Sequence, residues 1–423
     1  MTSAFAYHKR RHAAAHTEDY VYHQLVPYLG NKRRLLGFLH EALRRSGTLP
    51  SQTGEAGVFL DLFAGSGVVA RMARQVGYQV MANDWEPYSF ALNHALLTCD
   101  QPPAFAALGG YAAAVARLNA LPPEAGWVSA HFCPRQDDHY EPAHDRLFFC
   151  RHNGRQLDAM RRQIERWQQD GQISAVEMSA LLAPLLYAAS AASNTSGVFK
   201  AFHQGWGGQT GTALERIFRP IQLSPSRFCA SGQPAEVWCV DAALLAQRLR
   251  GRQLTVAYLD PPYNQHAYAS NYHVLNALTQ WQEQPLPPPS APRAKSGIDP
   301  SWRRERASAY NSARRAAQAY QQLLGQLDAR LLLTSYSLDG NIPAETVLQA
   351  NLARGRVRLM VQDMPRYRVS RQRPTPQPTV REFLVLTDTR QPADCSVDAL
   401  MAALLSGQPN PFMWENNHVH RNH

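Results

Sequence analysis

The amino-acid sequence predicts an α/β protein whose parallel sheet is interrupted by a long, mainly helical insertion. Val58–Leu62 is a short apolar strand that runs into the glycine turn Phe63-Ala-Gly-Ser-Gly67. A helix and a second strand at 79–82 follow, and this order of strand, turn, helix and strand is typical of a parallel sheet. Sheet-like segments return at Val237–Val240 and Leu254–Leu259, so the residues between the two groups of strands are expected to form an insertion.

The remaining elements follow from hydrophobic periodicity. Four leucines (35, 36, 39 and 43) recur on one face of an expected helix at 32–45, whose other face carries Lys and Arg. We expect further helices at 68–76, 155–169, 177–192 and near 271–281, and strands at 331–335, 356–362 and 381–387. The last three strands would complete the sheet.

The composition favours a folded protein with a polyanionic partner. The 423-residue chain carries a net charge of +10 and is 45% hydrophobic, which excludes wholesale disorder. The surplus lies in two segments: 285–320 has seven Lys/Arg against two acids, and 365–381 has five Arg and no acid. We expect both segments to contact nucleic-acid phosphates, and a merely basic surface is the alternative.

The sequence has no pattern of a membrane segment or a metal site. The longest near-apolar stretch, Leu181–Ala192, is interrupted by Pro184 and is shorter than the roughly 20 residues that span a bilayer. The N-terminus lacks the apolar segment of a signal peptide, and the six cysteines lack C-x-x-C spacing. We therefore expect a cytoplasmic protein without a membrane segment, a metal site or disulfides.

The glycine turn has the features of a nucleotide-like ligand site. Gly65 and Gly67 allow a ligand to approach the backbone closely. Asp84 ends the next strand, 23 positions after Asp61, where a carboxylate can accept hydrogen bonds from ribose hydroxyls. Because the full G-x-G-x-x-G pattern is not met, a ligand with a ribose but no pyrophosphate, such as S-adenosylmethionine, fits better. A plain tight turn is the alternative interpretation.

The segment Asp260-Pro-Pro-Tyr263 directly follows the strand Leu254–Leu259. Prolines cannot continue a central strand, so Asp260 and the Pro261 carbonyl are presented at its carboxyl end, where open α/β sheets hold their sites. A carboxylate and a carbonyl can accept both hydrogens of an exocyclic amine and turn its lone pair toward an electrophile. Tyr263 can stack on a base flipped out of a duplex. A turn that ends an ordinary strand is the alternative.

These motifs resemble the Dam-like (D12) group of N6-adenine DNA methyltransferases. The likeness is carried by Tyr28-Leu-Gly-Asn-Lys-Arg-Arg-Leu-Leu36, Asp61-Leu-Phe-Ala-Gly-Ser-Gly67 with Asn83-Asp84, Cys239-Val-Asp241 and Asp260-Pro-Pro-Tyr263. Gly65 and Asp260 are 195 positions apart. This separation resembles the arrangement in which a target-recognition domain lies between the donor-binding loop, here the glycine turn, and the catalytic tetrad, here Asp260-Pro-Pro-Tyr263.

The resemblance implies a Rossmann-like S-adenosylmethionine-dependent methyltransferase sheet with an inserted, mainly helical target-recognition domain. The expected divisions are a basic arm at 1–24, a catalytic domain at 25–98 and 236–390, the recognition insertion at 99–235 and a C-terminal tail at 391–423. The implied donor-binding residues are Tyr28, Gly30, Lys32, Asp61, Phe63, Gly65, Gly67, Asp84 and Asp241, and the implied catalytic tetrad is Asp260, Pro261, Pro262 and Tyr263. The expected DNA contacts are Asn194, Lys200, Arg366, Arg368, Arg371 and Arg373.

The implied reaction is methyl transfer to the N6 atom of a flipped adenine in double-stranded DNA, for restriction–modification with a cognate restriction endonuclease or for epigenetic marking. N4-cytosine or RNA amino methylation, and a non-catalytic DNA-binding protein on the same fold, are the alternatives. Asp at the first tetrad position favours adenine. We expect a monomer or weak dimer. Further candidates for the base pocket are Tyr272, His273 and Asn276, with a helix-packing role as the alternative. Tyr336 and Ser337, which lie at another strand end, are candidates for the rim of the site.

Overall fold

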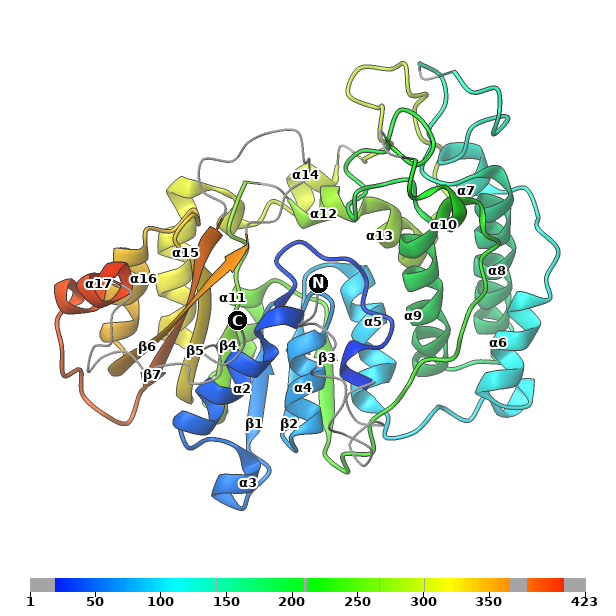
Figure 1. Ribbon diagram of the computed structural model, residues 1–423. Coiled ribbons are helices and arrows are strands. Elements are labelled where there is room, and N and C mark those ends of the chain that lie inside the picture. The colour runs from blue at the N-terminus through cyan, green and yellow to red at the C-terminus, as the bar shows by residue number, and fades with distance from the viewer. Residues whose placement is uncertain are drawn as a thin grey trace, which may run out of the picture.

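The computed structural model describes residues 20–141, 143–208, 211–265, 267–299, 301–365 and 379–406. One seven-stranded sheet in the order β3-β2-β1-β4-β5-β7-β6 lies at its centre, with helices on both faces (Figure 1). The strands are β1 (Val58–Asp61), β2 (Gln79–Asn83), β3 (Ala235–Trp238), β4 (Leu254–Leu259), β5 (Ala329–Ser337), β6 (Arg356–Pro365) and β7 (Thr379–Asp388). Every strand that the sequence predicts is present, and the α/β class is confirmed.

The pairing of the strands positions the functional edge of the sheet. Strands β1 to β5 pair in parallel, whereas β7 pairs antiparallel with both β5 and β6. The parallel strands therefore end at one edge of the sheet, and β7 begins at that same edge. In open α/β sheets this is the edge where ligands bind.

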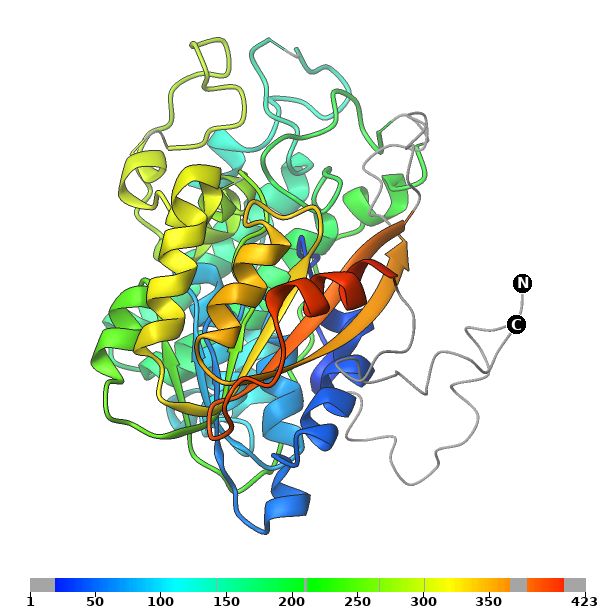
Figure 2. The same cartoon turned by 90° about the vertical axis from the view of Figure 1, so that its left-hand side faces the viewer.

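Side chains of the strands alternate between two apolar layers. Phe59 packs in a cluster with η2 (Lys32–Leu35), α2 (Leu36–Arg45) and α4 (Val68–Gln75). Leu60 packs on the opposite face, which is covered by α11 (Ala242–Arg248), α15 (Ala313–Gln326), α16 (Ala344–Leu352) and α17 (Val397–Ser406). Figure 2 looks onto α15, α16 and α17 from the side of this second layer.

The long insertion is helical, as expected. It contains η3 (Ala106–Leu108), α6 (Tyr111–Asn119), α7 (Trp127–His131), α8 (Arg151–Gln169), α9 (Ala175–Ala192) and α10 (Leu214–Phe218). Its apolar side chains share one core with α5 (Pro87–Thr98), α12 (Tyr268–Asn271) and α13 (His273–Gln280). Since α5 also packs against β3, the insertion is built onto this end of the sheet. The short elements α3 (Pro50–Thr53), α14 (Trp302–Glu305) and η4 (Ala309–Asn311) complete the fold.

Helix α9 begins earlier than the expected residue 177 because a capping box starts it. Ser174 Oγ accepts a hydrogen bond from the Glu177 N–H, and Glu177 Oε2 accepts one from the Ser174 N–H. With 18 residues and a mean hydropathy of 1.4, α9 is long and apolar enough to cross a membrane, but 61% of it is buried inside the protein. We therefore assign α9 as a helix of the core.

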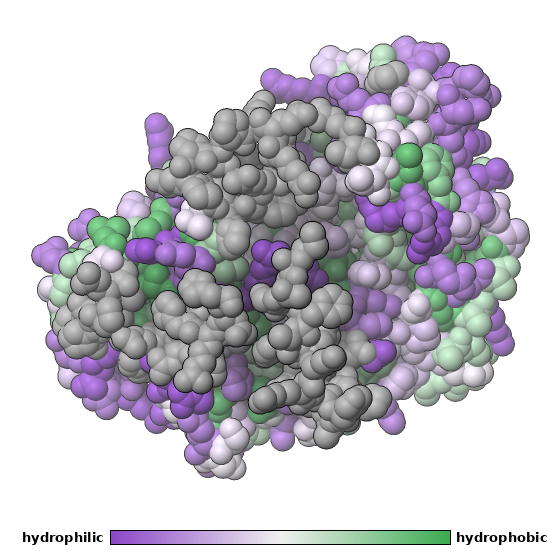
Figure 3. Space-filling model, viewed as in Figure 1, coloured by the Kyte–Doolittle hydropathy of each residue, from purple (hydrophilic) through white to green (hydrophobic). Residues whose placement is uncertain are grey.

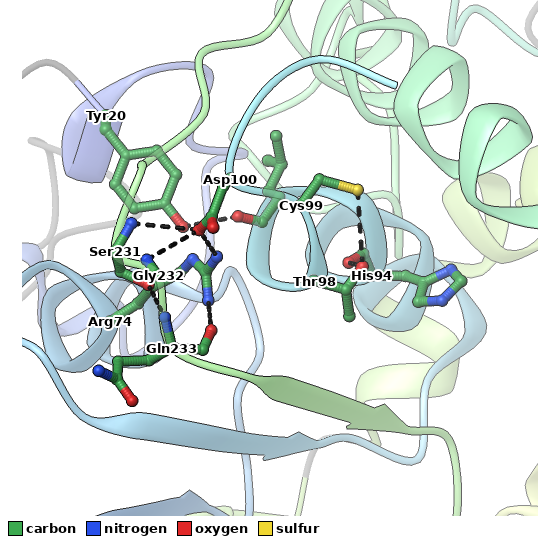
Figure 4. Close-up of polar contacts among 10 residues, drawn as sticks. Tyr20, Arg74, His94, Thr98, Cys99, Asp100, Ser231, Gly232 and Gln233 are labelled. Atoms are coloured by element: carbon green, nitrogen blue, oxygen red, sulfur yellow. Dashed lines mark hydrogen bonds and ion pairs between the residues drawn. The ribbon is translucent and has the colours of Figure 1, made fainter. Parts of the chain in front are cut away.

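The two ends of the insertion are tied together by one carboxylate (Figure 4). Asp100 Oδ1 accepts hydrogen bonds from the backbone N–H groups of Ser231 and Gly232, at 3.1 and 3.2 Å. Arg74 Nη2 lies 2.7 Å from the same oxygen, and Arg74 Nη1 donates to the Gln233 carbonyl. The chain therefore leaves the sheet after α5 and returns before β3 at one point, which is fixed to α4.

Candidate active site

A pocket lies at the carboxyl edge of the parallel strands. Its empty space is about 780 Å³, part of it open to solvent. Ten residues that the sequence predicts to bind the donor or to catalyse line it: Tyr28, Gly30, Lys32, Phe63, Asp84, Asp241, Asp260, Pro261, Pro262 and Tyr263. Segments more than two hundred residues apart in sequence thus meet in one cavity, as the resemblance implies.

The two glycines of the turn, Gly65 and Gly67, shape the pocket without lining it. Gly65 and Gly67 have φ values of +51° and +78°, in the left-handed region that favours glycine. A Cβ atom on Gly65 would lie 2.7 Å from the Tyr28 ring, and one on Gly67 would lie 1.6 Å from Asn93 Oδ1. The turn therefore requires glycine at both positions and lets Tyr28 pack closely on it.

Asp84 and Asp61 occupy different positions relative to the pocket. Asp84 lines it and accepts hydrogen bonds from the Gly65 N–H at 2.8 Å and the Glu86 N–H at 2.9 Å. Burial raises the pKa of Asp84 to about 6. Asp61 is 1% exposed and lies behind the pocket, where burial, reinforced by the charge of Asp260, raises its pKa well above the usual range. Asp61 is therefore placed to support the site rather than to contact a ligand.

Asp241 joins the pocket from the start of α11. Its Oδ1 atom accepts hydrogen bonds from the backbone N–H groups of Ala243 and Leu244, which is the arrangement of a helix N-cap. Asn83, at the end of β2, donates to the carbonyls of Leu62 and Val240 and so fixes this segment beside β1. The strand ends of β1 and β2 and the segment after β3 are thereby locked around the pocket.

Lys32 meets the tetrad at the end of β4. Its Nζ atom lies 3.0 Å from Asp260 Oδ1 and donates a 2.8 Å hydrogen bond to the Tyr263 hydroxyl. The Lys32 side chain is only 5% exposed, so this ion pair is shielded from solvent. Burial raises the pKa of Asp260, and the Lys32 charge partly offsets this shift. The Tyr263 ring packs edge-to-face on Tyr336, with centroids 4.7 Å apart.

A second carboxylate, Glu382, stands next to this pair. It lies on β7 opposite Ser337 of β5, and its Oε2 atom is 4.0 Å from Lys32 Nζ. The Tyr263 hydroxyl lies 3.4 Å from the same oxygen and donates to it. Burial raises the pKa of Glu382. No motif in the sequence marks Glu382, because its approach to Asp260 depends on the antiparallel return of β7.

Part of the Arg-rich stretch 293–320 closes the pocket from the other side. Arg306, Ser308, Tyr310 and Asn311 line it, and the Tyr310 ring packs edge-to-face on Phe63 at 5.4 Å. Arg306 Nη1 lies 3.7 Å from Glu86 Oε2, a buried carboxylate that also lines the pocket. This arginine therefore faces the pocket, and the expected phosphate contacts of the basic segment stay a prediction.

Glu86 is held by Asn276, one of the candidates for the base pocket. Asn276 Nδ2 donates a 2.6 Å hydrogen bond to Glu86 Oε2, and Asn276 Oδ1 accepts one from the Tyr88 N–H. Burial raises the pKa of Glu86 to about 7. His273 is also buried and bonds the Phe199 carbonyl. Both residues therefore have packing roles in α13.

Stacked tyrosines fix the segment that carries Lys32. The Tyr28 ring stacks on Tyr268 and on Tyr272, each at a centroid distance of 5.2 Å. The Leu29 N–H donates to the Tyr272 hydroxyl, and the Tyr268 hydroxyl donates to the Leu29 carbonyl. Tyr268 also lines the pocket. The helices after the tetrad therefore hold the N-terminal segment in place over the glycine turn.

The residues predicted to contact DNA differ in their exposure to solvent and in whether the structure describes them. Asn194 is fully buried: its amide donates to the carbonyls of His203 and Gly205, and its oxygen accepts from the Gly207 N–H. In this conformation it shapes the 193–208 loop and has no surface to offer DNA, contrary to expectation. Lys200 is exposed in the same loop. The other four predicted contacts, Arg366, Arg368, Arg371 and Arg373, lie outside the described residues.

Comparison with known proteins agrees with this geometry. Residues 28–286 match the family model of the D12 class N6 adenine-specific DNA methyltransferases. The chain is 29% identical over 314 residues to the type II methyltransferase M.NlaIII of Neisseria lactamica, covering 74% of this chain and 84% of the relative. It is 26% identical over 348 residues to M.CviAII of Paramecium bursaria Chlorella virus 1, covering 81% and 93%.

Other relatives are longer. The chain is 27% identical over 323 residues to M.FokI of Planomicrobium okeanokoites, a match that covers 76% of this chain and 46% of the relative. The chain thus spans about half the length of that enzyme. The family match includes the N-terminal motif, the glycine turn and the tetrad, and the seven-stranded sheet carries all three at one pocket. The chain therefore belongs to the D12 class of N6 adenine-specific DNA methyltransferases.

Proposed function

We propose that the protein transfers a methyl group from S-adenosylmethionine to the N6 atom of an adenine flipped out of double-stranded DNA. The observation that carries this proposal is that Asp260 and Asp84 line one pocket at the carboxyl edge of the parallel strands. Aromatic rings line the same pocket. A carboxylate for the base amine and a carboxylate for a ribose are both present.

The pocket residues fit this donor. Asp84 and Asp241 offer carboxylates at its wall, and Phe63, Tyr28 and Tyr310 offer rings against which an adenine moiety and a sulfonium can pack. When bound, S-adenosylmethionine would supply a sulfonium methyl that is already activated for displacement. The roles of Gly30 and Lys32 would be to close the pocket from the N-terminal segment, and those of Asp61, Gly65 and Gly67 to hold its shape.

The tetrad would orient the target amine. An exocyclic amine is a weak nucleophile because its lone pair is delocalised into the ring. Asp260 and the Pro261 carbonyl would accept its two hydrogens and turn the lone pair toward the methyl group, and Tyr263 would stack on the base. Pro262 would keep the tetrad from continuing the β4 ladder.

We propose that the DNA lies across the mouth of this pocket. Arg33 and Arg34 are exposed and directly follow the buried Lys32 on η2, so two cations are next in sequence to the residue that pairs with Asp260. Lys200 and the arginines 366, 368, 371 and 373 remain our further candidates for phosphate contacts. The insertion 99–235, whose two ends Asp100 ties together, would read the target sequence, with 25–98 and 236–390 as the catalytic part.

The biological setting is also a proposal. The names of relatives such as M.NlaIII describe type II methyltransferases, and we propose that this chain likewise protects DNA from a cognate restriction endonuclease in the cytoplasm. We expect a monomer or weak dimer, because only six large apolar side chains of the described residues are exposed. Figure 3 shows hydrophilic residues between the small apolar patches of one face.

The test is to incubate the protein with donor labelled in its methyl group and with either duplex DNA or RNA, and to hydrolyse the product to nucleosides. The proposal predicts that the label is found as N6-methyladenine in duplex DNA. Label on cytosine, on RNA alone or on neither nucleic acid would contradict it. In the last case, absence of donor binding by calorimetry would favour a non-catalytic protein on this fold.

A further inference from the structure

We infer that Glu382 is a second carboxylate of the catalytic centre, which shares Lys32 with Asp260 and thereby keeps Asp260 a strong acceptor for the N6 amine. The inference rests on the proposed function. Glu382 lies in β7, the last of the seven strands in sequence, beyond residue 286 where the family match ends. It belongs to none of the motifs that the sequence analysis identifies.

Glu382 is connected to Asp260 through a single intervening group, the ammonium of Lys32. Its Oε2 atom is 4.0 Å from Lys32 Nζ, which is itself 3.0 Å from Asp260 Oδ1. The Tyr263 hydroxyl connects the same groups, because it accepts from Lys32 at 2.8 Å and donates to Glu382 at 3.4 Å. The Glu382 side chain is only 16% exposed. These four side chains therefore form one shielded network.

The charges of the network do not balance. Two carboxylates share one ammonium, so the network carries one excess negative charge when all three groups are ionised. The positive charge of Lys32 then attracts both Asp260 and Glu382. If Glu382 were neutral, Lys32 would pair with Asp260 alone, and the carboxylate of Asp260 would attract the amine less strongly.

The chemistry requires a strong acceptor at Asp260. The N6 lone pair forms the new bond to the methyl carbon, and the bond from that carbon to sulfur breaks with its electron pair staying on sulfur. The amine gains positive charge in this step and must lose one proton, which a hydrogen-bonded carboxylate can take. The negative charge on Glu382 would favour both the hydrogen bond and this proton transfer, so Glu382 is a positioning residue that acts through Lys32 and Asp260.

Other groups near the network do not replace this role. Those that face Asp260 or Glu382 from neighbouring elements are Asp61 on β1, Tyr258 on β4, Tyr268 on α12, Ser335 and Tyr336 on β5, and Asp339 after β5. Asp61 has no contact with Lys32 among the described ion pairs, and Asp339 is exposed. Burial raises the pKa of both Asp260 and Glu382, and the charge of Lys32 offsets part of each shift.

The test compares Glu382→Gln and Glu382→Asp with wild type and with Glu345→Gln, an exposed carboxylate on α16. Single-turnover methylation of duplex DNA is measured from pH 5 to 9, and donor affinity by calorimetry. We expect Glu382→Gln to lower the rate about tenfold and to move the acidic limb of the pH profile to lower pH, with donor affinity unchanged. Glu382→Asp should recover part of the rate, and Glu345→Gln should match wild type.

The inference is overturned if Glu382→Gln keeps the wild-type rate and pH profile. It is also overturned if the rate falls without a shift of the profile while donor affinity or thermal stability falls in parallel, because that pattern would mark a purely structural role. Both results leave the proposed function intact. Failure of the wild-type protein to form N6-methyladenine would instead contradict the proposed function itself.

Discussion

Lys32 Nζ lies 3.0 Å from Asp260 Oδ1, so η2 near the N-terminus meets the residue that directly follows β4. This contact brings the N-terminal motif, the tetrad and, through the same ammonium, β7 into one centre. The stacking of Tyr28 on Tyr268 and Tyr272 fixes the segment that makes it. The function of this centre is therefore sensitive to single charges.

Removal of the shared cation should destabilise the fold. Lys32→Met would leave Asp260 and Glu382 buried without their partner, and we expect the free energy of unfolding to fall by about 3 kcal/mol at pH 8. Because the pKa values of both carboxyls are already raised, protonation should relieve the loss, so the deficit should shrink toward pH 5. Chemical denaturation at both pH values measures it.

A surface ion pair provides the control for Lys32. Arg252 and Glu236 lie 2.9 Å apart, but both side chains are 42% exposed. Arg252→Met should therefore cost less than about 1 kcal/mol at either pH. Equal losses for Lys32→Met and Arg252→Met would contradict the importance of the buried network.

The glycine turn should not tolerate a side chain. Gly65→Ala would force alanine into φ +51° and bring its Cβ within 2.7 Å of Tyr28, so we expect a loss of about 1–2 kcal/mol in stability and weaker donor binding. Gly37→Ala in α2 is the control, since no atom lies within 4 Å and helix propensity favours alanine. Calorimetric titration with S-adenosylmethionine compares the two, and equal affinities would refute the role assigned to the turn.

Stability should depend on pH through Glu86. Its pKa is about 7 in the fold, against about 4.3 when unfolded, so its contribution to stability is full below pH 4 and is lost as the pH rises through 7. Glu86→Gln removes this dependence. The stability of the variant relative to wild type should rise by about 2 kcal/mol between pH 5 and 8. Denaturant titrations measure the stability difference between variant and wild type. A stability difference that stays constant from pH 5 to 8 would show that the fold does not raise the pKa of Glu86.

DNA affinity should depend on Arg33 and Arg34. Both are exposed and directly follow Lys32, which lines the pocket, whereas Arg250 is exposed between α11 and the start of β4, on the side of the sheet away from the strand ends. Reversal of both arginines to Glu should weaken duplex binding and reduce the slope of log affinity against log salt by about two, close to 0.9 per lost phosphate contact. Arg250→Glu should leave the slope unchanged, and an equal effect of the two changes would contradict the proposed path. The same titration tests Arg366, Arg368, Arg371 and Arg373.

Local motifs in the sequence were sufficient for one half of the site. The tetrad, the glycine turn and Asp84 are each specified by neighbours in sequence: two prolines end β4, and two glycines shape the turn. The strands were predictable because a parallel sheet buried on both faces requires short apolar runs. The capping box at Ser174 was also readable, and it accounts for the early start of α9.

The other half of the site depends on tertiary arrangement. Glu382 reaches the pocket through the return of β7, and no local signal marks it. Arg306 comes from the loop before α15, where the basic composition indicated a polyanion but not this pocket. Asn194 is a residue that we expected to contact DNA from a Gly-rich loop. Its side chain instead donates hydrogen bonds to backbone carbonyls and holds that loop together. Periodicity and composition do not distinguish a polar side chain that faces a ligand from one that faces its own backbone.

Asp260→Asn removes the carboxylate that we propose orients the adenine amine for methylation. The measurement is the single-turnover formation of N6-methyladenine in duplex DNA, with donor affinity measured in parallel by calorimetry. We expect the variant to bind S-adenosylmethionine as wild type does but to methylate at least about a hundredfold more slowly. Methylation by the variant at the wild-type rate, or a wild-type product other than N6-methyladenine, would contradict it.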